Sequence, residues 1–129
     1  MHRPAGDDGS SVVEFTLVSV LLVGLFLGIL QVAVVLHTRN VLVSAAQEGA
    51  RFAANADRTP ADGALRTRQA IGEALGAGVR DRMTVTPLPA DTTGALPVVG
   101  MRVSGPVPVF FLPAGPLRLT VDGHALDEG

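Results

Sequence analysis

Side chains that could do chemistry are few in this sequence, and their spacing assembles no reactive site. Cysteine is absent, which excludes thiol nucleophiles and a disulfide framework. His2, His37 and His124 lie too far apart for the ligand spacing of a metal site. There is also no Ser-His-acid order in a recognisable frame and no phosphate-binding glycine loop. We therefore predict no catalytic residue, no metal site, no cofactor and no enzymatic activity.

The charge balance argues against a nucleic-acid partner. The formal net charge is −2, and nine arginines are balanced by nine carboxylates after residue 36. A nucleic-acid-binding surface normally needs a clustered basic excess, which this balance does not supply. The arginines between residues 62 and 82 are expected on a solvated face, paired with the carboxylates of the same segment, which are Asp62, Glu73 and Asp81.

One carboxylate, Glu14, has unusual surroundings. It lies near the start of an apolar run, residues 12–36, in which Gln31 is the only other strongly polar residue. As a helix this run reaches roughly 35 Å, enough to cross a hydrocarbon core of about 30 Å. A buried helix that is apolar on all sides would need partners all around it, and the remaining chain is too short to supply them. We predict a single membrane span.

Glu14 has two interpretations at this position. A carboxylate at the centre of a span costs roughly 3 kcal/mol, and less near an interface. In the first interpretation Glu14 reaches the headgroups and has no further role. In the second it pairs with a positive group at the same depth. A cut between Gly9 and Ser10 would create such a group, a free α-amine four residues from Glu14, on this subunit or on a neighbour.

Periodicity predicts the elements that position these residues. The helical pattern of the apolar run continues without a break, which predicts one long helix over residues 11–55, ended by Thr59-Pro60. A second helix is predicted over residues 62–82. The apolar residues of this segment fall roughly on one stripe of the helix, which consists of Leu65, Ile71, Leu75 and Val79. Three glycines in the same segment weaken the helical pattern.

The residue composition of the sequence changes at residue 83. Runs of β-branched residues, punctuated by proline and glycine, predict three or four short strands at residues 84–86, 98–103, 107–112 and 117–121. Gly100, Gly105 and Gly115 are expected at strand-end turns. The expected fold is α+β: a long N-terminal helix, transmembrane and then amphipathic, with a second short helix and a small antiparallel β-sheet.

Two motifs, one at each end of the apolar run, resemble those of pilus proteins. Gly9 followed by Glu14-Phe15 is similar to the processing site of type IV prepilins, in the Glu-Phe form of the tight-adherence (Tad/Flp) class. After the run, Asn40-Val41-Leu42 and then AAQEGAR at residues 45–51 resemble the TadE-like family of minor pseudopilins. The resemblance covers about residues 9–54, and its strength lies in the order and spacing of the pieces.

This resemblance implies a minor pilin-like (pseudopilin) subunit in the assembly of a Tad/Flp-type pilus. Gly9 would precede the cut made by a prepilin peptidase, and Ser10 would be the mature N-terminus. Glu14 would help to register the subunit in the assembly, with Phe15 as its aromatic companion. The further partners implied are other pilins and pseudopilins, an inner-membrane platform and a secretion ATPase.

Four parts of the chain are expected. Residues 1–9 would be a prepilin-like leader, residues 10–36 the transmembrane helix, residues 37–58 a helix extension outside the membrane, and residues 59–129 a small extracytoplasmic domain of helix and strands. The protein would be a single-pass protein of the cell membrane, with a cytoplasmic N-terminus.

Charge does not support this orientation. Prepilin leaders are usually basic, whereas here Arg3 stands against Asp7 and Asp8. Arg39 and Arg51 follow the span, so the positive-inside rule mildly opposes a cytoplasmic leader. The orientation therefore rests on the resemblance.

Gly24 and Gly28 form a Gly-x-x-x-Gly pair within the span. Small residues four apart let two helices approach closely in lipid, although the pair also occurs often by chance. A helix-packing role is one interpretation, and ordinary span composition is the other.

Two further classes of protein remain open. One is a secreted binding domain behind an ordinary signal peptide, cut near residues 43–45, although residues 12–36 are long for the apolar region of such a peptide. The other is a signal-anchored extracytoplasmic binding domain unrelated to pili, which would give Gly9 and Glu14 no special meaning.

Overall fold

The computed structural model describes residues 7–55, 57–91, 93–94, 96–107 and 117–126. Three helices are followed by three strands: α1 (Asp7–Ala53), α2 (Pro60–Leu75), α3 (Ala77–Arg82), β1 (Thr84–Asp91), β2 (Val98–Val107) and β3 (Leu117–Leu126). The strands form one antiparallel sheet in the order β1-β2-β3. The predicted α+β fold, with its long apolar helix, short second helix and small antiparallel sheet, is confirmed.

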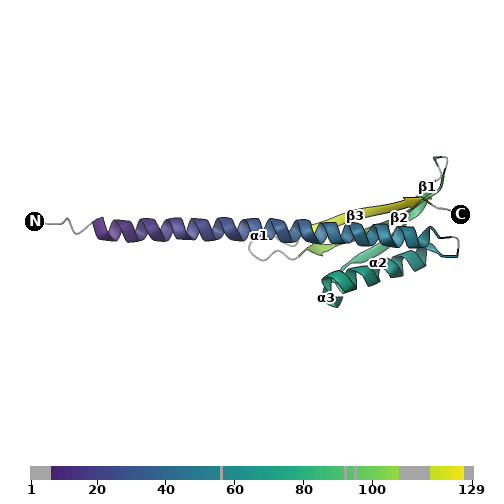
Figure 1. Cartoon of the computed structure of the whole chain (residues 1–129), viewed down its shortest axis with the longest axis horizontal. Helices are drawn as coiled ribbons and strands as arrows, with labels where there is room; N and C mark the ends of the chain where they lie inside the picture. The colour runs from purple at the N-terminus through teal and green to yellow at the C-terminus, as the bar shows by residue number, and fades with distance from the viewer. Residues whose placement is uncertain (1–6, 56, 92, 95, 108–116, 127–129) are drawn as a thin grey trace, which may run out of the picture.

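The helix α1 dominates the shape of the molecule (Figure 1). It contains 47 residues, and at about 1.5 Å per residue it is about 70 Å long. Its N-terminal half projects alone, whereas its C-terminal half lies beside the sheet and α2. The helix starts at Asp7, four residues before the predicted start, and ends at Ala53, two residues before the predicted end.

The second predicted helix is two helices in the structure. Gly76 lies between α2 and α3 with φ of 92°, a conformation that side chains with a Cβ rarely adopt, so the helical path breaks there. At the other end of α2, the Thr59 hydroxyl accepts a hydrogen bond from the Asp62 N–H at 3.2 Å, and the Asp62 carboxylate accepts one from the Thr59 N–H at 2.9 Å. This capping box, with Pro60 in the first turn, fixes the start of α2.

The central strand of the sheet is β2. Thr84 of β1 pairs with Ser104, and the pairing of β2 with β3 runs from Val98 and Leu126 to Val107 and Leu117. The predicted strands at residues 98–103 and 117–121 are parts of longer strands. Val107, the first residue of the predicted strand 107–112, instead ends β2. The rest of that predicted strand, like Gly115, lies outside the described residues.

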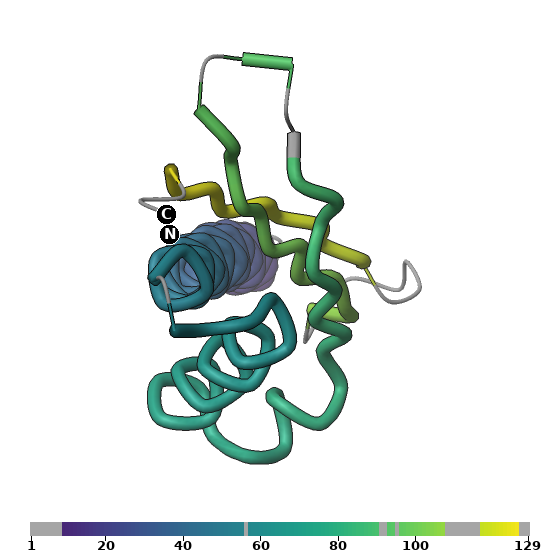
Figure 2. The backbone as a smooth tube through the Cα atoms, turned by 90° about the vertical axis from the view of Figure 1, so that its right-hand side faces the viewer, coloured from purple at the N-terminus to yellow at the C-terminus, as the bar shows by residue number. Residues whose placement is uncertain are grey.

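Small residues let the layers approach closely. Seen along its axis, α1 lies between the sheet and α2 (Figure 2). A Cβ placed on Gly123 of β3 would lie 2.4 Å from the backbone nitrogen of Gln47, so β3 packs directly against the backbone of α1. Most of the core residues that α1 contributes are alanines. The whole core consists of Leu42, Ala45, Ala46, Ala50, Ala53, Ala54, Ile71, Met83, Val99, Met101, Val103 and Val121.

Gly100 and Gly105 lie within β2, so their predicted placement at strand-end turns is wrong. A Cβ on Gly105 would stand 2.3 Å from the sulfur of Met83, and one on Gly100 would stand 2.9 Å from the ring of His124. Both glycines therefore make room for side chains that cross the strand, a requirement that arises from tertiary packing.

Candidate functional site

The residues of the expected processing site lie in the first turns of α1. Gly9 and Ser10 are exposed, and Glu14 and Phe15 are exposed one turn later. Ser10 and Glu14 are four residues apart on a helix, which places them on the same face, about 5–6 Å apart between Cβ atoms. An amine at Ser10 and the carboxylate of Glu14 are thus within reach of each other or of one shared partner.

Gly24 and Gly28 face open space. A Cβ built on either residue meets no atom within 4 Å. At 3.6 residues per turn, Ser10, Glu14, Gly24 and Gly28 fall within an arc of about 80° on the helix. The structure therefore brings the acidic residue and both small residues onto one uncovered face.

The N-terminal half of α1 is an apolar surface without cover. The large apolar side chains of residues 12–30 are exposed almost without exception, and among the described residues α1 is the one helix long and apolar enough to cross a membrane. Exposed apolar side chains on every face are the pattern of a segment surrounded by lipid. This is consistent with a single membrane span or a signal anchor.

The AAQEGAR motif lies in the C-terminal half of α1, and most of it faces the core. Ala45, Ala46 and Ala50 are buried. A Cβ on Gly49 would lie 1.7 Å from the Thr67 hydroxyl oxygen and 2.6 Å from the Gly63 carbonyl oxygen. Gly49 is therefore the point at which the backbones of α1 and α2 cross, and no larger residue fits there without displacing α2.

Glu48 in the same motif forms an ion pair with Arg66 of α2. Arg66 also donates to Gln69 at 3.1 Å. We predicted carboxylate partners for the arginines within their own segment, and for Arg66 this is wrong, because α1 supplies the carboxylate. For Arg80 it is confirmed, with 3.1 Å to Asp81.

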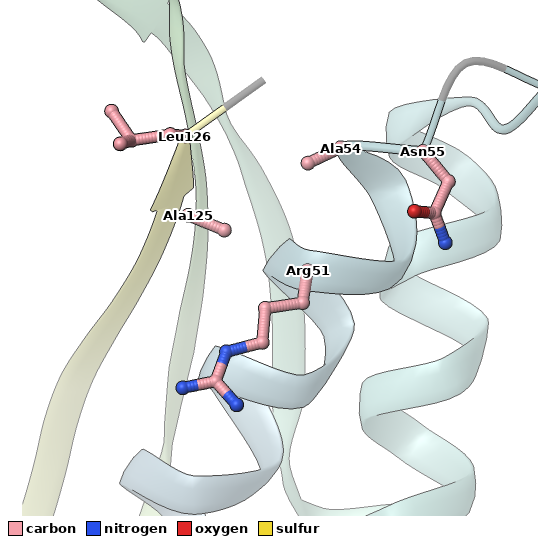
Figure 3. A pocket seen from close by; sticks show the side chains of 5 residues that line it. All are labelled: Arg51, Ala54, Asn55, Ala125 and Leu126. Atoms are coloured by element: carbon pink, nitrogen blue, oxygen red, sulfur yellow. The ribbon is translucent and has the colours of Figure 1, made fainter. Parts of the chain in front are cut away.

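A shallow hollow of about 380 Å³ lies where α1 and β3 end (Figure 3). Its lining residues are Arg51, Ala54, Asn55, Ala125 and Leu126. The Arg51 side chain extends along the hollow and Ala125 points toward the helix. One cation and one amide beside apolar side chains can bind an acidic group but include no nucleophile or base. The sequence alone gave no sign of this hollow, since β3 was predicted to end at residue 121.

A third ion pair links neighbouring strands. Arg102 donates from Nε to Asp122 Oδ1 at 2.8 Å and from the guanidinium to Oδ2 at 3.0 Å. These hydrogen bonds hold the pKa of Asp122 below its ordinary value and raise the pKa of Arg102. His124 is an exposed residue of β3. No three His, Asp or Glu side chains within the described part of the chain are placed to hold a metal ion.

Comparison with known proteins found a family match for one part of the chain. The family model of TadE-like proteins matches residues 9–51. Over these residues the chain is similar to the TadE-like family. The matched region starts at Gly9 and ends at Arg51, so it contains both the uncovered and the packed half of α1. No curated protein and no solved structure matches the chain.

Residues of the TadE-like region contact residues of α2, which lies outside the matched region. Gly49 and Glu48 belong to it, whereas their partners Thr67, Gly63 and Arg66 are on α2. The AAQEGAR motif is therefore the surface of α1 on which the rest of the domain packs. Sequence reasoning identified the motif but missed this role, although two small residues four apart in α2, Gly63 and Thr67, were a signal of a close helix crossing.

Proposed function

We propose that this protein is a minor pilin-like (pseudopilin) subunit in the assembly of a Tad/Flp-type pilus and is processed by a prepilin peptidase. The observation that carries the proposal is the TadE-like match, which starts at Gly9 and continues through the exposed Glu14 of α1. In this proposal the chain is a substrate and a structural component, not an enzyme.

The proposal assigns residues 10–36 of α1 to the cell membrane. Residues 1–9 would be the cytoplasmic leader, with the extension 37–58 and the domain 59–129 on the extracytoplasmic side. The exposed apolar side chains of residues 12–30 support the span, and the TadE-like resemblance supports the orientation.

The uncovered face of α1 gives the proposal a physical mechanism. Cleavage between Gly9 and Ser10 would leave a positive α-amine on the face that also carries Glu14. Opposite charges attract strongly where water is scarce, so the amine of one subunit and Glu14 of another would fix their relative height. Gly24 and Gly28 would let the neighbouring helix approach closely. Neighbours would be other pilins and pseudopilins, assembled on an inner-membrane platform driven by a secretion ATPase.

Processing is the direct test. Membranes containing the full chain, with and without a co-expressed prepilin peptidase, would be extracted and the intact mass of the protein measured. We expect a peptidase-dependent start at Ser10, lost in Gly9→Leu and kept in the matched variant Gly6→Leu. An intact N-terminus in both membranes would contradict the proposal.

Helix pairing is a second test. Disulfide crosslinking, with an added oxidant, between a cysteine introduced at Leu17 and a second cysteine introduced into the span of a co-expressed pilin would report contacts in the membrane, because the chain has no cysteine of its own. Gly24→Leu with Gly28→Leu should lower crosslinking to pilins, whereas Leu22→Ala on another face should not. Unchanged crosslinking would remove the packing role of the two glycines.

The reading as an ordinary secreted protein gains no support from the packing. A cut near residues 43–45 would remove Leu42, a fully buried residue of the core. It would also separate the domain from the turns of α1 that precede Ala46. A mature start near residue 46 in the mass measurement would nevertheless favour that reading over the pilus proposal.

A further inference from the structure

The domain covers α1 further toward the N-terminus than the end of the apolar run. Gln31 and Thr38 are 4% and 6% exposed, although Gln31 lies within residues 12–36. On another side of the same turns, Val32 and Leu36 are more than half exposed. One side of the helix is therefore covered at a depth where the other side is still apolar and bare.

The first residue of β3 lies at this depth. In Figure 1, β3 runs beside α1 in the same direction. Gly123 contacts the backbone at Ala46 and Gln47. Leu117 is six residues earlier, about 20 Å of strand, which corresponds to about 13 residues of helix and places it level with residue 33 or 34. The same arithmetic places Leu126 level with residue 53, in agreement with the hollow it shares with Ala54.

The outer edge of the hydrocarbon would fall at the same level. If Glu14 marks the inner interface, a core of about 30 Å accommodates about 20 helical residues and ends near Val34. Leu117 is about half exposed, so it offers apolar surface at the height where the hydrocarbon ends.

Several arginines lie at about the height of Leu117 at this end of the domain. Arg118 follows it in β3, and Arg39 lies just above the boundary on α1. The α3 helix is at a similar height, because the backbone of Arg82 packs on Gly105, the residue paired with Leu119. Among the described residues nearest this end, four arginines accompany two carboxylates: Arg39, Arg80, Arg82 and Arg118 with Glu73 and Asp81.

We propose that this end of the domain, defined by Leu117, Arg118, Arg39 and Arg82, docks on the lipid surface. Leu117 inserts at the edge of the hydrocarbon, and the guanidinium groups bind headgroup phosphates, as arginine side chains at interfaces do. This inference rests on the proposed span of α1. Its consequence is that the domain has a fixed height and rotation on the membrane, so the face with Gly24 and Gly28 is presented directly below it.

Depth-dependent quenching tests the docking. The full chain would carry a single cysteine with an environment-sensitive fluorophore at Leu117→Cys, Leu126→Cys or Val20→Cys, in vesicles of equal parts phosphatidylcholine and phosphatidylglycerol containing brominated acyl chains. We expect strong quenching at positions 20 and 117 and little at 126, which is at the other end of the same strand. Quenching at 20 but equally weak quenching at 117 and 126 overturns the docking alone. No quenching at 20 overturns the span itself.

Charge provides the second measurement. Arg82→Gln with Arg118→Gln should reduce quenching at position 117 in the vesicles with phosphatidylglycerol. The control Arg51→Gln, at the far end of the domain, should leave it unchanged. Equal quenching in the double variant and in the parent would overturn the role of the arginines.

Discussion

The two halves of α1 are built from side chains of different size, and each half matches a different environment. In the N-terminal half the residues are large and bare, as with Phe15 at 74% exposure. In the C-terminal half they are small and covered, as with Ala46 and Ala50 at 0%. Lipid chains adapt to large side chains, whereas a neighbouring backbone at close range requires alanine or glycine. Side-chain size along a single helix thus distinguishes its uncovered half from the half that packs against the domain.

Glycine shows the same contrast. The space beside Gly49 is occupied by the chain itself, because Thr67 and Gly63 lie where a Cβ of Gly49 would be. Gly24 and Gly28 are open, with nothing near that space. Gly49 is therefore required for folding, whereas any requirement for Gly24 and Gly28 would arise from another subunit. Four measurements probe this comparison, and the expected effects decrease from the first to the last.

The largest effect is expected for Gly49→Ala. The new Cβ would overlap the Thr67 hydroxyl and the Gly63 carbonyl, so we expect the free energy of unfolding of the domain to fall by about 3 kcal/mol or more. Pulse proteolysis of the full chain in detergent, with trypsin in a urea series, would measure it. Gly24→Ala is the matched control and should change nothing; an equal loss in both variants would refute the contrast between the halves.

Truncation of the core should have the next largest effect. Ile71 of α2 is fully buried against the alanines of α1. Ile71→Ala should reduce the free energy of unfolding by about 2–4 kcal/mol through lost burial and a cavity. Leu65→Ala, on the exposed face of the same helix, should cost far less. Similar urea midpoints for the two variants would show that α2 does not pack on α1 as described.

Acid should weaken the domain, not the apolar half of α1. The pKa of Asp62 is lowered from 3.8 chiefly by the hydrogen bond from the Thr59 backbone, and that of Asp122 is lowered chiefly by its hydrogen bonds with Arg102. Lowered carboxylate pKa values mean that the unfolded chain binds protons first. Their stabilisation is therefore present above about pH 4 and is lost as the pH falls through the folded-state pKa values.

Urea midpoints measured between neutral pH and pH 3 would test this. The parent should lose stability in acid, and Asp62→Asn with Asp122→Asn should flatten that dependence while lowering stability at neutral pH. An equally steep acid loss in the double variant would assign the dependence to other groups.

The smallest effect is expected at the ion pair between the two helices. Glu48 and Arg66 are both partly exposed, so their coupling should be about 0.5 kcal/mol and should shrink in high salt. A double-mutant cycle with Glu48→Gln and Arg66→Gln measures it. A coupling free energy well above about 1 kcal/mol would contradict this expectation. It would show that the ion pair of Glu48, and not only the packing at Gly49, joins α1 to α2.

The local pattern of apolar and β-branched residues predicted much of the fold. The predictions that were wrong depend on contacts between residues far apart in the sequence. The long helix and the strands follow from periodicity and β-branched runs. The break at Gly76 depends on a positive φ, to which the three glycines between residues 72 and 78 pointed without identifying which one breaks the helix. Arg66 pairs across 18 residues of chain, and Gly105 accommodates the side chain of Met83, which lies between α3 and β1. Neither contact is encoded by spacing along one element.

A cysteine scan along α1 tests the central comparison most directly. Single cysteines at residues 15–54 of the otherwise cysteine-free chain would be exposed, in vesicles, to a water-soluble maleimide. We predict no reaction at any position up to about residue 34, and then a helical alternation in which Gln47→Cys reacts and Ala46→Cys does not. Uniform reaction from residue 37 onward, or reaction within residues 15–30, would contradict the division of one helix between lipid and protein.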